Sequence, residues 1–476
     1  MFFAALFALL AASRLCHVRI LWEGDALPLA AAEQMLHGKT IYRDIWYDKP
    51  PLVAAFHLLP AGLLPAAGVP FTAGWPLRMA DALYALLACS IAYGFACELW
   101  SVREGVWAAG LMGFFLIFDF PASAIPVGSD LLMLAPHLAA VWLAWKRRPF
   151  WCGAMAGVAF WASPKALLVL AVCALWDIGG VLSIAAGFAA VCAAGVVWLA
   201  AAGALGPYWD EVWRWGRLYA GSPFVADPVR NGIVRTASWA GFHATVVAAA
   251  GVFLWKSAGS QWNARWKWLA WLAISLAGVA AGMRFFPRYY FVLLPAVVTM
   301  ASRGLALMGK RSVLAALLLL LIPLARFAPA YWTALTDPAW RDTAMDRDSR
   351  AAAALTLQLA RPGDTLFVWG YRPEIFAYTQ MPAGTMYLDS QALTGVPADR
   401  HLTQSEPVER VEAARRRVAL AETRPAFVLD GLGLYNPRLA IGQFADLRDW
   451  FAQYREVARS GQTVIYELRS RTAAGK

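Results

Sequence analysis

The sequence predicts a polytopic α-helical membrane protein with about eleven transmembrane helices and a C-terminal extracytoplasmic α/β domain. The first observation behind this class is composition. The chain of 476 residues is 60% hydrophobic and 15% charged, whereas soluble domains are about 45–50% apolar and about 25% charged. The second is a series of apolar runs of roughly membrane-spanning length. The third is a change to a charged, mixed composition from about residue 330.

The apolar runs predict the individual helices of a transmembrane domain covering residues 1–329. They lie approximately at residues 2–21, 78–99, 105–121, 129–145, 151–163, 165–178, 181–204, 239–255, 268–283, 289–302 and 312–328. The Ser-Pro-Lys stretch at 163–165 leaves two interpretations open, a turn between two helices or a kink within one longer helix. The first run lacks the charged start and the cleavage site of a signal peptide, so we interpret it as a helix.

Short basic loops predict the orientation. Residues 145–151, 256–268 and 302–312 are basic and separate apolar runs, and Lys and Arg collect on the cytoplasmic side of a membrane. Counting helices from an inside N-terminus also places all three loops in the cytoplasm. We therefore expect a multi-pass protein of the plasma (inner) membrane. Arg14 and Arg19, at the outer end of the first run, oppose this bias. Because the basic residues flank membrane spans and do not gather on one soluble face, we expect no binding of nucleic acid.

The same count places the long segment 22–77 outside. "LPLAAAEQMLHG" (27–38) has a helical apolar face and a Gly stop. "PPLVAAFHLLPAGLL" (50–64) begins with two prolines, which favour a helix start. We expect two helices that lie on the membrane surface and are joined by residues 39–49.

Residues 330–476 predict a soluble α/β unit. The stretches "TLFVWG", "FVLDG" and "TVIYEL" are short β-branched runs bounded by Gly, Asp or Pro, as is typical of strands. Helical patterns surround them at about 408–420 and 441–455. The six cysteines all lie in apolar runs and none follows residue 192, so we expect no disulfide in this unit.

Charged residues in four places of the outer side need an explanation, because such groups at helix ends are costly unless they are paired, hydrated or used. By the helix count all four places face the same side, so we expect them to line one outer cavity. The residues are Glu23 and Asp25; Arg43, Asp44, Asp48 and Lys49; Asp130; and Arg284, Arg288 and Tyr289.

Such a cavity suits sugar transfer from a lipid-linked donor. A carboxylate can take the proton from an attacking hydroxyl, while Lys and Arg bind the phosphate that leaves. The chain has no G-x-G-x-x-G or G-x-x-x-x-G-K-[ST] loop, so no nucleotide-binding loop is predicted. A divalent cation is a further option, held by Glu23 and Asp130; otherwise no cofactor is expected.

The residues also carry a family resemblance. "WEGDALPLAAAEQMLHGKTIYRDIWYDKPPL" resembles the first outer loop of GT-C glycosyltransferases, in particular the branch of protein O-mannosyltransferases and bacterial lipid A aminoarabinose transferases. "PVGSDLLML" resembles the second acidic site of that branch, and "RFFPRYYFVLLP" its R-F-x-x-H-Y element. "DTLFVWGYRPEIFAYTQMPAGTMYL" is similar to the exported domain of the bacterial relatives. These matches extend from about residue 22 to about residue 390.

The resemblance implies an inverting glycosyltransferase that uses a polyprenyl-phosphate sugar, with a catalytic carboxylate at Glu23 or Asp25. It further implies that Lys49 approaches the donor phosphate and that Asp130 is the second acid. Arg288 stands where relatives often have histidine. The acceptor stays open between a protein, lipid A, a polysaccharide and another glycolipid.

Other interpretations compete with these roles. Asp44 pairs with Arg43 or Lys49 as a brace of the loop, Asp130 caps a helix, or Arg284 and Arg288 only reach to the membrane surface. At the level of the whole chain, the alternatives are a transporter or flippase of lipid-linked sugars and a non-catalytic scaffold. Internal repeats typical of transporters are not visible in the sequence.

Overall fold

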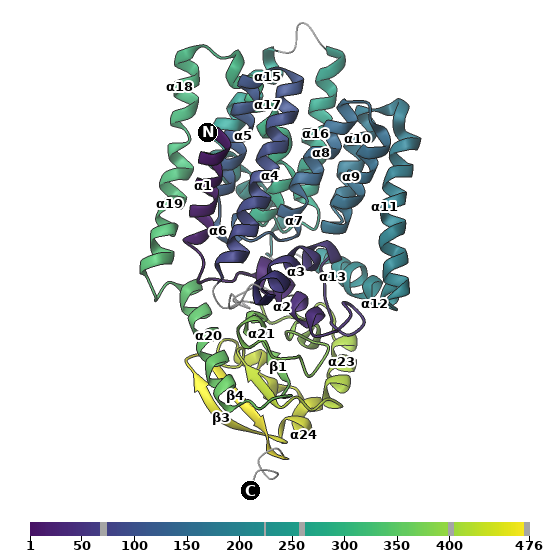
Figure 1. The fold of residues 1–476 in the computed structure, drawn as a ribbon, viewed down its shortest axis with the longest axis vertical. Coiled ribbons are helices and arrows are strands. Elements are labelled where there is room, and N and C mark those ends of the chain that lie inside the picture. The colour runs from purple at the N-terminus through teal and green to yellow at the C-terminus, as the bar shows by residue number, and fades with distance from the viewer. Residues whose placement is uncertain (67–73, 223–224, 257–261, 398–403, 471–476) are drawn as a thin grey trace.

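The fold has a layer of long, roughly parallel helices, a layer of short helices across their ends, and a C-terminal unit with a β-sheet beyond these (Figure 1). This computed structural model describes residues 1–66, 74–222, 225–256, 262–397 and 404–470. Every predicted apolar run contains a helix. Helices of the first layer are α1 (Phe2–Leu15), α4 (Trp75–Leu99), α5 (Val102–Ile117), α8 (Leu134–Trp145), α9 (Pro149–Ala162), α10 (Ala166–Trp176), α11 (Val181–Ala201), α14 (Pro228–Phe242), α15 (Ala244–Lys256), α16 (Trp262–Ala280), α17 (Leu294–Leu307), α18 (Lys310–Leu318) and α19 (Leu321–Thr336).

Length and composition identify the clearest membrane spans. Within the described residues, three helical segments are long and apolar enough to cross a membrane: Trp75–Leu99, Ile178–Ala201 and the continuous segment Lys310–Leu359. A fourth arises if α14 and α15, which meet at an angle of 89°, count as one span. The remaining apolar helices, such as α1 and α9, are shorter. The total of eleven spans therefore stays a prediction, while the class of polytopic helical membrane protein agrees with the structure.

The structure decides one alternative that the sequence left open and corrects one predicted helix. The break between α9 and α10 falls at residues 163–165, so the Ser-Pro-Lys stretch is a turn and not a kink. The predicted run at 239–255 is divided, because the chain bends at His243 between α14 and α15. The His243 ring stacks on Phe115 and Trp239 and lies 3.6 Å from the carboxylate of Asp119. These contacts fix the bend.

The middle layer contains both predicted surface helices. They are α2 (Glu23–Leu36) and α3 (Pro51–Ala66), which pack on each other between the long helices and the C-terminal unit (Figure 1). Helix α2 begins at Glu23, four residues earlier than expected. Its first turn therefore contains Glu23 and Asp25, where negative charge is favourable because it faces the positive end of the helix dipole.

The C-terminal unit is built on a four-stranded sheet in the order β1-β2-β4-β3. Strands β1 and β2 are parallel, β2 and β4 are antiparallel, and β3 and β4 form an antiparallel pair. The main elements are α20 (Arg341–Leu359), β1 (Leu366–Trp369), α21 (Glu374–Thr379), α22 (Gln391–Thr394), α23 (Val411–Ala421), β2 (Phe427–Asp430), α24 (Arg448–Phe451), β3 (Tyr454–Ser460) and β4 (Thr463–Leu468).

The three predicted strands and the helix near 408–420 are confirmed as β1, β2, β4 and α23. The prediction of a helix at 441–455 is wrong. That stretch forms short 3₁₀ turns and α24, and strand β3 already begins at Tyr454. The hairpin partner β4 follows across Gly461, whose φ of 41° suits glycine in a tight turn. Pairing with β4, a tertiary effect, thus overrides the local helical pattern.

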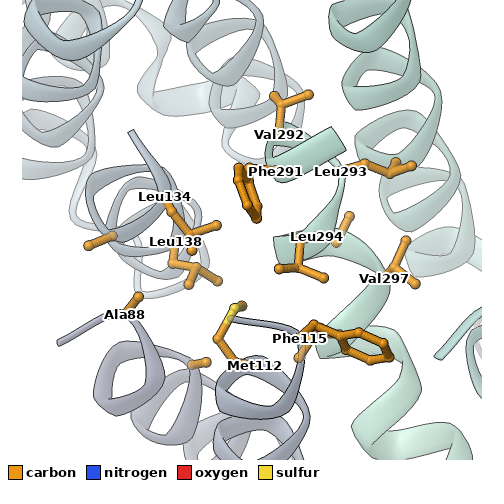
Figure 2. Packing of buried hydrophobic residues seen from close by; sticks show 14 of the residues in the cluster. Ala88, Met112, Phe115, Leu134, Leu138, Phe291, Val292, Leu293, Leu294 and Val297 are labelled. Atoms are coloured by element: carbon orange, nitrogen blue, oxygen red, sulfur yellow. The ribbon is translucent and has the colours of Figure 1, made fainter. Parts of the chain in front are cut away.

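Buried apolar side chains pack α4, α5 and α8 against the start of α17. Ala88 of α4, Met112 and Phe115 of α5, and Leu134 and Leu138 of α8 face the start of α17 (Figure 2). From that side come Phe291, Val292, Leu293, Leu294 and Val297, all within the same buried cluster (Figure 2). The 3₁₀ helix η4 (Pro287–Val292) is therefore anchored by its second half. Its first half carries Arg288 and Tyr289, of which Tyr289 belongs to the same buried cluster.

Candidate functional site

A cavity of about 390 Å³ lies where α2, the start of α3, the short helix α7 (Ser129–Leu132), the turn before α10, α13 (Trp215–Gly221) and η4 meet. Seven of the ten predicted site residues line it: Glu23, Asp48, Lys49, Asp130, Arg284, Arg288 and Tyr289. Two further basic residues, Lys165 and Arg217, also line the cavity. The elements that contribute these groups are far apart in the sequence, so the cavity depends on the assembled fold.

Glu23 and Arg288 form the first charged pair. Arg288 Nη2 donates a hydrogen bond to Glu23 Oε1 at 3.2 Å, and Nη1 lies at the same distance from that oxygen. Within the described residues, Glu23 Oε2 has no hydrogen-bond partner. One oxygen of this carboxylate is thus held by a cation while the other remains available to accept a proton.

Asp130 and Lys165 form the second pair. Lys165 Nζ donates to Asp130 Oδ1 at 2.8 Å and lies 3.4 Å from the centre of the Tyr289 ring. The helix-cap interpretation of Asp130 is wrong, because Gly128 occupies the N-cap position and no side chain caps this turn. Sequence reasoning missed Lys165. It is the only charged residue between Trp151 and Trp176, and a lone ionisable group in an apolar run signals function.

Lys49 and Asp48 form the third pair, and it connects to the C-terminal unit. Lys49 Nζ donates to Asp48 Oδ2 at 2.8 Å, and Gln391 Nε2 of α22 donates to the same oxygen at 3.1 Å. Burial would lower the pKa of Lys49, but nearby Asp48 and Glu23 raise it above its ordinary value. Lys49 therefore stays an ammonium at neutral pH and can bind an anion.

Arg284 presents an unused donor at the cavity. Its guanidinium lies 3.6 Å from the centre of the Tyr219 ring, and Nε donates to the backbone oxygen of Tyr219 at 3.1 Å. The residue is 4% exposed, and Nη2 is buried without a hydrogen-bond partner. Burying such a donor is costly unless a ligand or water satisfies it. This burial also argues against the interpretation of Arg284 as a residue that only reaches to the membrane surface.

Asp25 does not line the cavity, although it starts the same helix as Glu23. It is fully buried, at 2.7 Å from Arg78 Nη1 and 3.4 Å from His57 Nε2. Arg78 also binds Asp81 at 2.8 Å. Burial alone would raise the pKa of Asp25, but Arg78 and His57 hold it below the ordinary value. Of the two carboxylates left open as the catalytic base, the geometry therefore favours Glu23.

Arg43 and Asp44 also lie outside the cavity lining. Asp44 Oδ2 accepts hydrogen bonds from Arg43 Nη2 and from the backbone N–H of Thr40, both at 2.8 Å. These bonds, with the hydrogen bond from Arg43 as the largest cause, lower the pKa of Asp44 to about 2. Arg43 Nη1 reaches the backbone oxygen of Ala202 at 3.3 Å. The pair braces the loop between α2 and α3, which agrees with the structural alternative.

The residues expected to hold a divalent cation do not fit one in this arrangement. Glu23 is paired with Arg288 and Asp130 with Lys165, so a metal would have to displace two basic partners. Within the described residues there is also no group of three or more His, Cys, Asp and Glu side chains placed to hold an ion.

The balance of charge in the cavity is positive. Five basic residues line it, namely Lys49, Lys165, Arg217, Arg284 and Arg288, against the three carboxylates of Glu23, Asp48 and Asp130. The difference of two positive charges complements a phosphate monoester, which carries about −1.5 to −2 at neutral pH.

A second cavity of about 400 Å³ lies close to the first and is almost entirely apolar. Neighbouring residues of the same elements line the two cavities: Val53 and Leu131 the charged one, Leu52 and Leu132 the apolar one. The wall of the apolar cavity consists of Leu52, Ala55, Phe56, Leu59, Tyr84, Leu87, Ile91, Leu132, Ala135, Pro136, Ala139, Met155 and Val158. A charged cavity thus lies beside an apolar one.

No model of a known protein family matches the sequence, and no curated protein matches it. Solved structures do match. ArnT from Cupriavidus metallidurans in the apo state has 15% identity and a TM-score of 0.58, with 98% of each chain covered. The same protein bound to undecaprenyl phosphate has 16% identity and a TM-score of 0.58, with 98% of this chain and 97% of that chain covered. The Archaeoglobus fulgidus oligosaccharyltransferase in complex with Zn and sulfate has 16% identity and a TM-score of 0.52, with 95% and 71% covered.

These likenesses concern the fold, since the identities are low. ArnT, a lipid A aminoarabinose transferase, and the archaeal oligosaccharyltransferase are both GT-C proteins. The chain therefore has the fold of the polytopic GT-C membrane enzymes. The resemblance read from the sequence is confirmed at this level.

Proposed function

We propose that this chain, which has the GT-C fold, is an inverting glycosyltransferase that moves a sugar from a polyprenyl-phosphate donor to an acceptor hydroxyl. The observation that carries the proposal is the pairing of Glu23 with Arg288 in a cavity with an excess of basic side chains. A carboxylate beside a phosphate-binding surface is the arrangement that this reaction requires. The fold shared with a protein solved with undecaprenyl phosphate supports the same donor class.

The basic residues of the cavity would bind the donor phosphate. Lys49 and Lys165 each keep one carboxylate partner and have further ammonium N–H groups to donate. Arg284 offers the unpartnered Nη2. As the bond between the anomeric carbon and the phosphate oxygen breaks, the phosphate gains negative charge. Preorganised cations at that position stabilise the transition state more than the ground state, which accelerates the reaction.

Glu23 would be the general base. Its Oε2 takes the proton of the acceptor hydroxyl while the hydroxyl oxygen forms a bond to the anomeric carbon. The electron pair of the breaking bond goes to the phosphate, and polyprenyl phosphate leaves. Because the nucleophile attacks from the side opposite to the leaving group, the configuration at the anomeric carbon inverts. Asp130, held by Lys165, lies in the same cavity to balance the oxocarbenium-like charge.

The apolar cavity would take the lipid chain of the donor. Its lining offers apolar side chains almost exclusively, which suits an isoprenoid chain that enters from the hydrocarbon of the bilayer. With the phosphate in the charged cavity and the chain in the apolar one, the donor bridges two adjacent spaces. In this arrangement the reacting carbon would lie beside the carboxylates.

The setting of the reaction is part of the proposal. We place the site on the outer face of the plasma (inner) membrane, with residues 330–476 as an extracytoplasmic domain, as the distribution of basic loops predicts. The acceptor is a hydroxyl of a protein, of lipid A, of a polysaccharide or of another glycolipid. The identity of the sugar is open.

The test is a transfer assay with the full chain in proteoliposomes. The proteoliposomes are incubated with a panel of polyprenyl-phosphate sugars that are radiolabelled in the sugar. Membranes from cells that lack this protein are added as the source of the acceptor. We expect label to move to a membrane acceptor and polyprenyl phosphate to be released in equal amount, and Glu23→Gln to abolish both. If instead a fluorescent lipid-linked sugar crosses the bilayer with its phosphate bond intact and no label is transferred, the chain is a transporter and the proposal fails.

A further inference from the structure

A third cavity, separate from those of the proposed active site, lies where the end of α1 meets the connection between α19 and α20. Its volume is about 580 Å³, and it shares no lining residue with the charged or the apolar cavity. Figure 1 shows this junction at the edge of the long helices, where α19 continues into the C-terminal unit. The lining residues are Val18, Arg19, Ala334, Leu335, Thr336, Asp337, Pro338, Thr343, Asp346, Arg347 and Arg350.

The cavity contains basic groups that the rest of the protein does not neutralise. Among the described residues, Arg19 and Arg347 have no hydrogen-bond or ion-pair partner. The carboxylate of Asp346, by contrast, is fully engaged. Its Oδ1 accepts from the backbone N–H of Leu21 at 3.0 Å and from the hydroxyl of Tyr378 at 2.6 Å, and its Oδ2 accepts from Arg350 at 2.8 Å. Two guanidinium groups therefore remain for an external anion.

Further donors point to the same place. Thr343 lines the cavity, and its Oγ1 is a buried atom without a hydrogen-bond partner. Thr343, Arg347 and Arg350 lie on one face of α20, at spacings of four and three residues. Thr343 is in the first turn of this 19-residue helix, where the dipole favours an anion. The hydroxyl, the helix end and the guanidinium groups all suit a phosphate.

The opposite wall is apolar and continues along α19. Val18, Ala334 and Leu335 contribute to the cavity. Several large apolar residues of α19 are exposed: Leu321, Ile322, Trp332 and Leu335. Because α19 belongs to a segment apolar enough to span a membrane, this surface suits contact with acyl chains. An acyl chain on α19 would bring its phosphate to the level of the arginines.

We propose that this cavity binds the phosphate headgroup of an anionic phospholipid from the surrounding membrane. Arg19 and Arg347 hold the phosphate, Thr343 donates its hydroxyl hydrogen to a phosphate oxygen, and the acyl chains lie along α19. The proposal accounts for Arg19, which opposes the charge bias of the predicted topology. It does not depend on the proposed sugar transfer, since the cavities share no residue.

The position of the cavity connects lipid binding to the active site. Helix α20 holds the segment that precedes Glu23: Asp346 accepts from the N–H of Leu21, and Asp342 Oδ2 accepts from Trp22 Nε1 at 3.0 Å. A phosphate bound to Arg347 on the same helix stabilises α20 in the position from which these hydrogen bonds are made. The lipid thus acts on a helix that fixes the start of α2.

The test measures binding of defined lipids to the purified full chain by native mass spectrometry. The probes are phosphatidylglycerol, which is anionic, phosphatidylcholine, which has no net charge, and inorganic phosphate. We expect the wild-type chain to bind phosphatidylglycerol in preference to phosphatidylcholine. Arg19→Ala with Arg347→Ala should weaken the tightest phosphatidylglycerol site by about a hundredfold, or about tenfold for each arginine removed.

Two further variants keep the outcome clear. Arg341→Ala with Arg361→Ala removes two exposed arginines that line none of the three cavities, and it should bind phosphatidylglycerol as the wild type does. Thr343→Val keeps the side-chain shape but removes the hydroxyl. This single change should by itself weaken the binding of phosphatidylglycerol. Equal affinity of the Arg19 and Arg347 double variant and the wild type would overturn the proposal. Displacement of phosphatidylglycerol by millimolar inorganic phosphate would also overturn it, because the site would then recognise free phosphate and not a lipid.

Discussion

Arg288 donates a hydrogen bond to the carboxylate of Glu23 at 3.2 Å although 265 residues separate the two in the sequence. This contact joins the first turn of α2 to η4, just before α17. Both elements are anchored elsewhere, α2 by α3 and by the C-terminal unit and η4 by its buried second half. The pair is therefore a fixed part of the cavity, and its chemistry can be tested by changing either partner.

The first prediction concerns Glu23. Glu23→Gln keeps the shape of the side chain and a hydrogen-bond acceptor for Arg288 but removes the basic carboxylate. We expect the rate of sugar transfer to fall by about 10²–10⁴-fold, the usual contribution of a general base, while donor binding changes little. The measurement is transfer of labelled sugar at saturating donor. A variant that keeps more than half of the wild-type rate would contradict the role of Glu23.

Asp25 serves as the matched control on the same helix turn. Asp25→Asn weakens the buried contacts with Arg78 and His57, and an imperfectly satisfied buried group costs about 1–3 kcal/mol of stability. We expect a lower unfolding temperature in detergent but, in the folded fraction, a rate of transfer close to that of the wild type. If Asp25→Asn loses activity without losing stability, the two carboxylates have exchanged roles.

The second prediction concerns the pair of Asp130 and Lys165. Lys165→Met leaves a largely buried carboxylate without its cation, and breaking such a pair costs about 3–5 kcal/mol. The double variant Asp130→Asn with Lys165→Met should recover most of that stability. It should not recover donor binding, because the ammonium group that we propose to bind the donor phosphate is still absent. We expect KM for the donor to rise about tenfold in both variants.

A double-mutant cycle checks this prediction by measuring stability and KM for the wild type and all three variants. Stability is expected to show strong coupling between the two positions. Additive losses of stability would mean that the two residues do not interact in the folded protein.

The helices and the general position of the site could be predicted from the sequence because their causes are local. Apolar runs long enough to form helices are visible along the chain, and charged residues at the ends of such runs stand out against them. Counting runs placed Glu23, Lys49, Asp130 and Arg288 on one side of the membrane. The structure brings these four residues to the same cavity.

Other features depend on the assembled fold and had no local signal. Glu23 and Asp25 are two residues apart in the sequence, and contacts with other elements distinguish them. Glu23 pairs with Arg288, whereas Asp25 is buried against Arg78 and His57. The helical pattern near residue 454 gave no sign of β3, since pairing with β4 creates that strand. Lys165 did have a signal, a single charge in a long apolar run. It also stands next to Ser-Pro, however, and this pattern indicates a turn or a kink and not a binding site.

The third prediction concerns metal ions. Because Glu23 and Asp130 are each neutralised by a basic side chain, sugar transfer should not need a divalent cation. We expect the rate in excess EDTA to stay within about twofold of the rate without chelator, and added Mg²⁺ or Mn²⁺ to give no stimulation. A loss of activity in EDTA that Mg²⁺ restores would show that a cation replaces one of the basic partners during the reaction.

The last prediction concerns Asp389, a carboxylate of the C-terminal unit beside the loop that carries Lys49. Asp389 is 2% exposed, its Oδ1 accepts from the backbone N–H of Gln391 at 2.8 Å, and its Oδ2 is buried without a partner. Burial raises its pKa from 3.8 to about 7; Asp48 and Glu23 add to this, and Lys49 and the hydrogen bond from Gln391 oppose it. The folded state therefore keeps a proton on Asp389 that the unfolded state has already lost.

The sign of the effect on stability follows from this difference in proton binding. Between about pH 4 and pH 7 the folded state binds more protons at Asp389 than the unfolded state, so the free energy of unfolding decreases as the pH rises. The full cost is reached above about pH 8 and is at most about 4 kcal/mol, at 1.36 kcal/mol for each pKa unit. Asp389→Asn removes the titrating group and keeps the acceptor for Gln391.

We expect Asp389→Asn to unfold at a higher temperature than the wild type at pH 8 and at nearly the same temperature at pH 4.5, when thermal unfolding in detergent is followed across this range. Asp449→Asn, which changes an exposed carboxylate of the same unit, controls for the loss of one negative charge and should show the same small difference at both pH values. A gain from Asp389→Asn that is equal at pH 4.5 and pH 8 would mean that Asp389 is ionised in the folded protein throughout. In that case Lys49, and not burial, would dominate its surroundings.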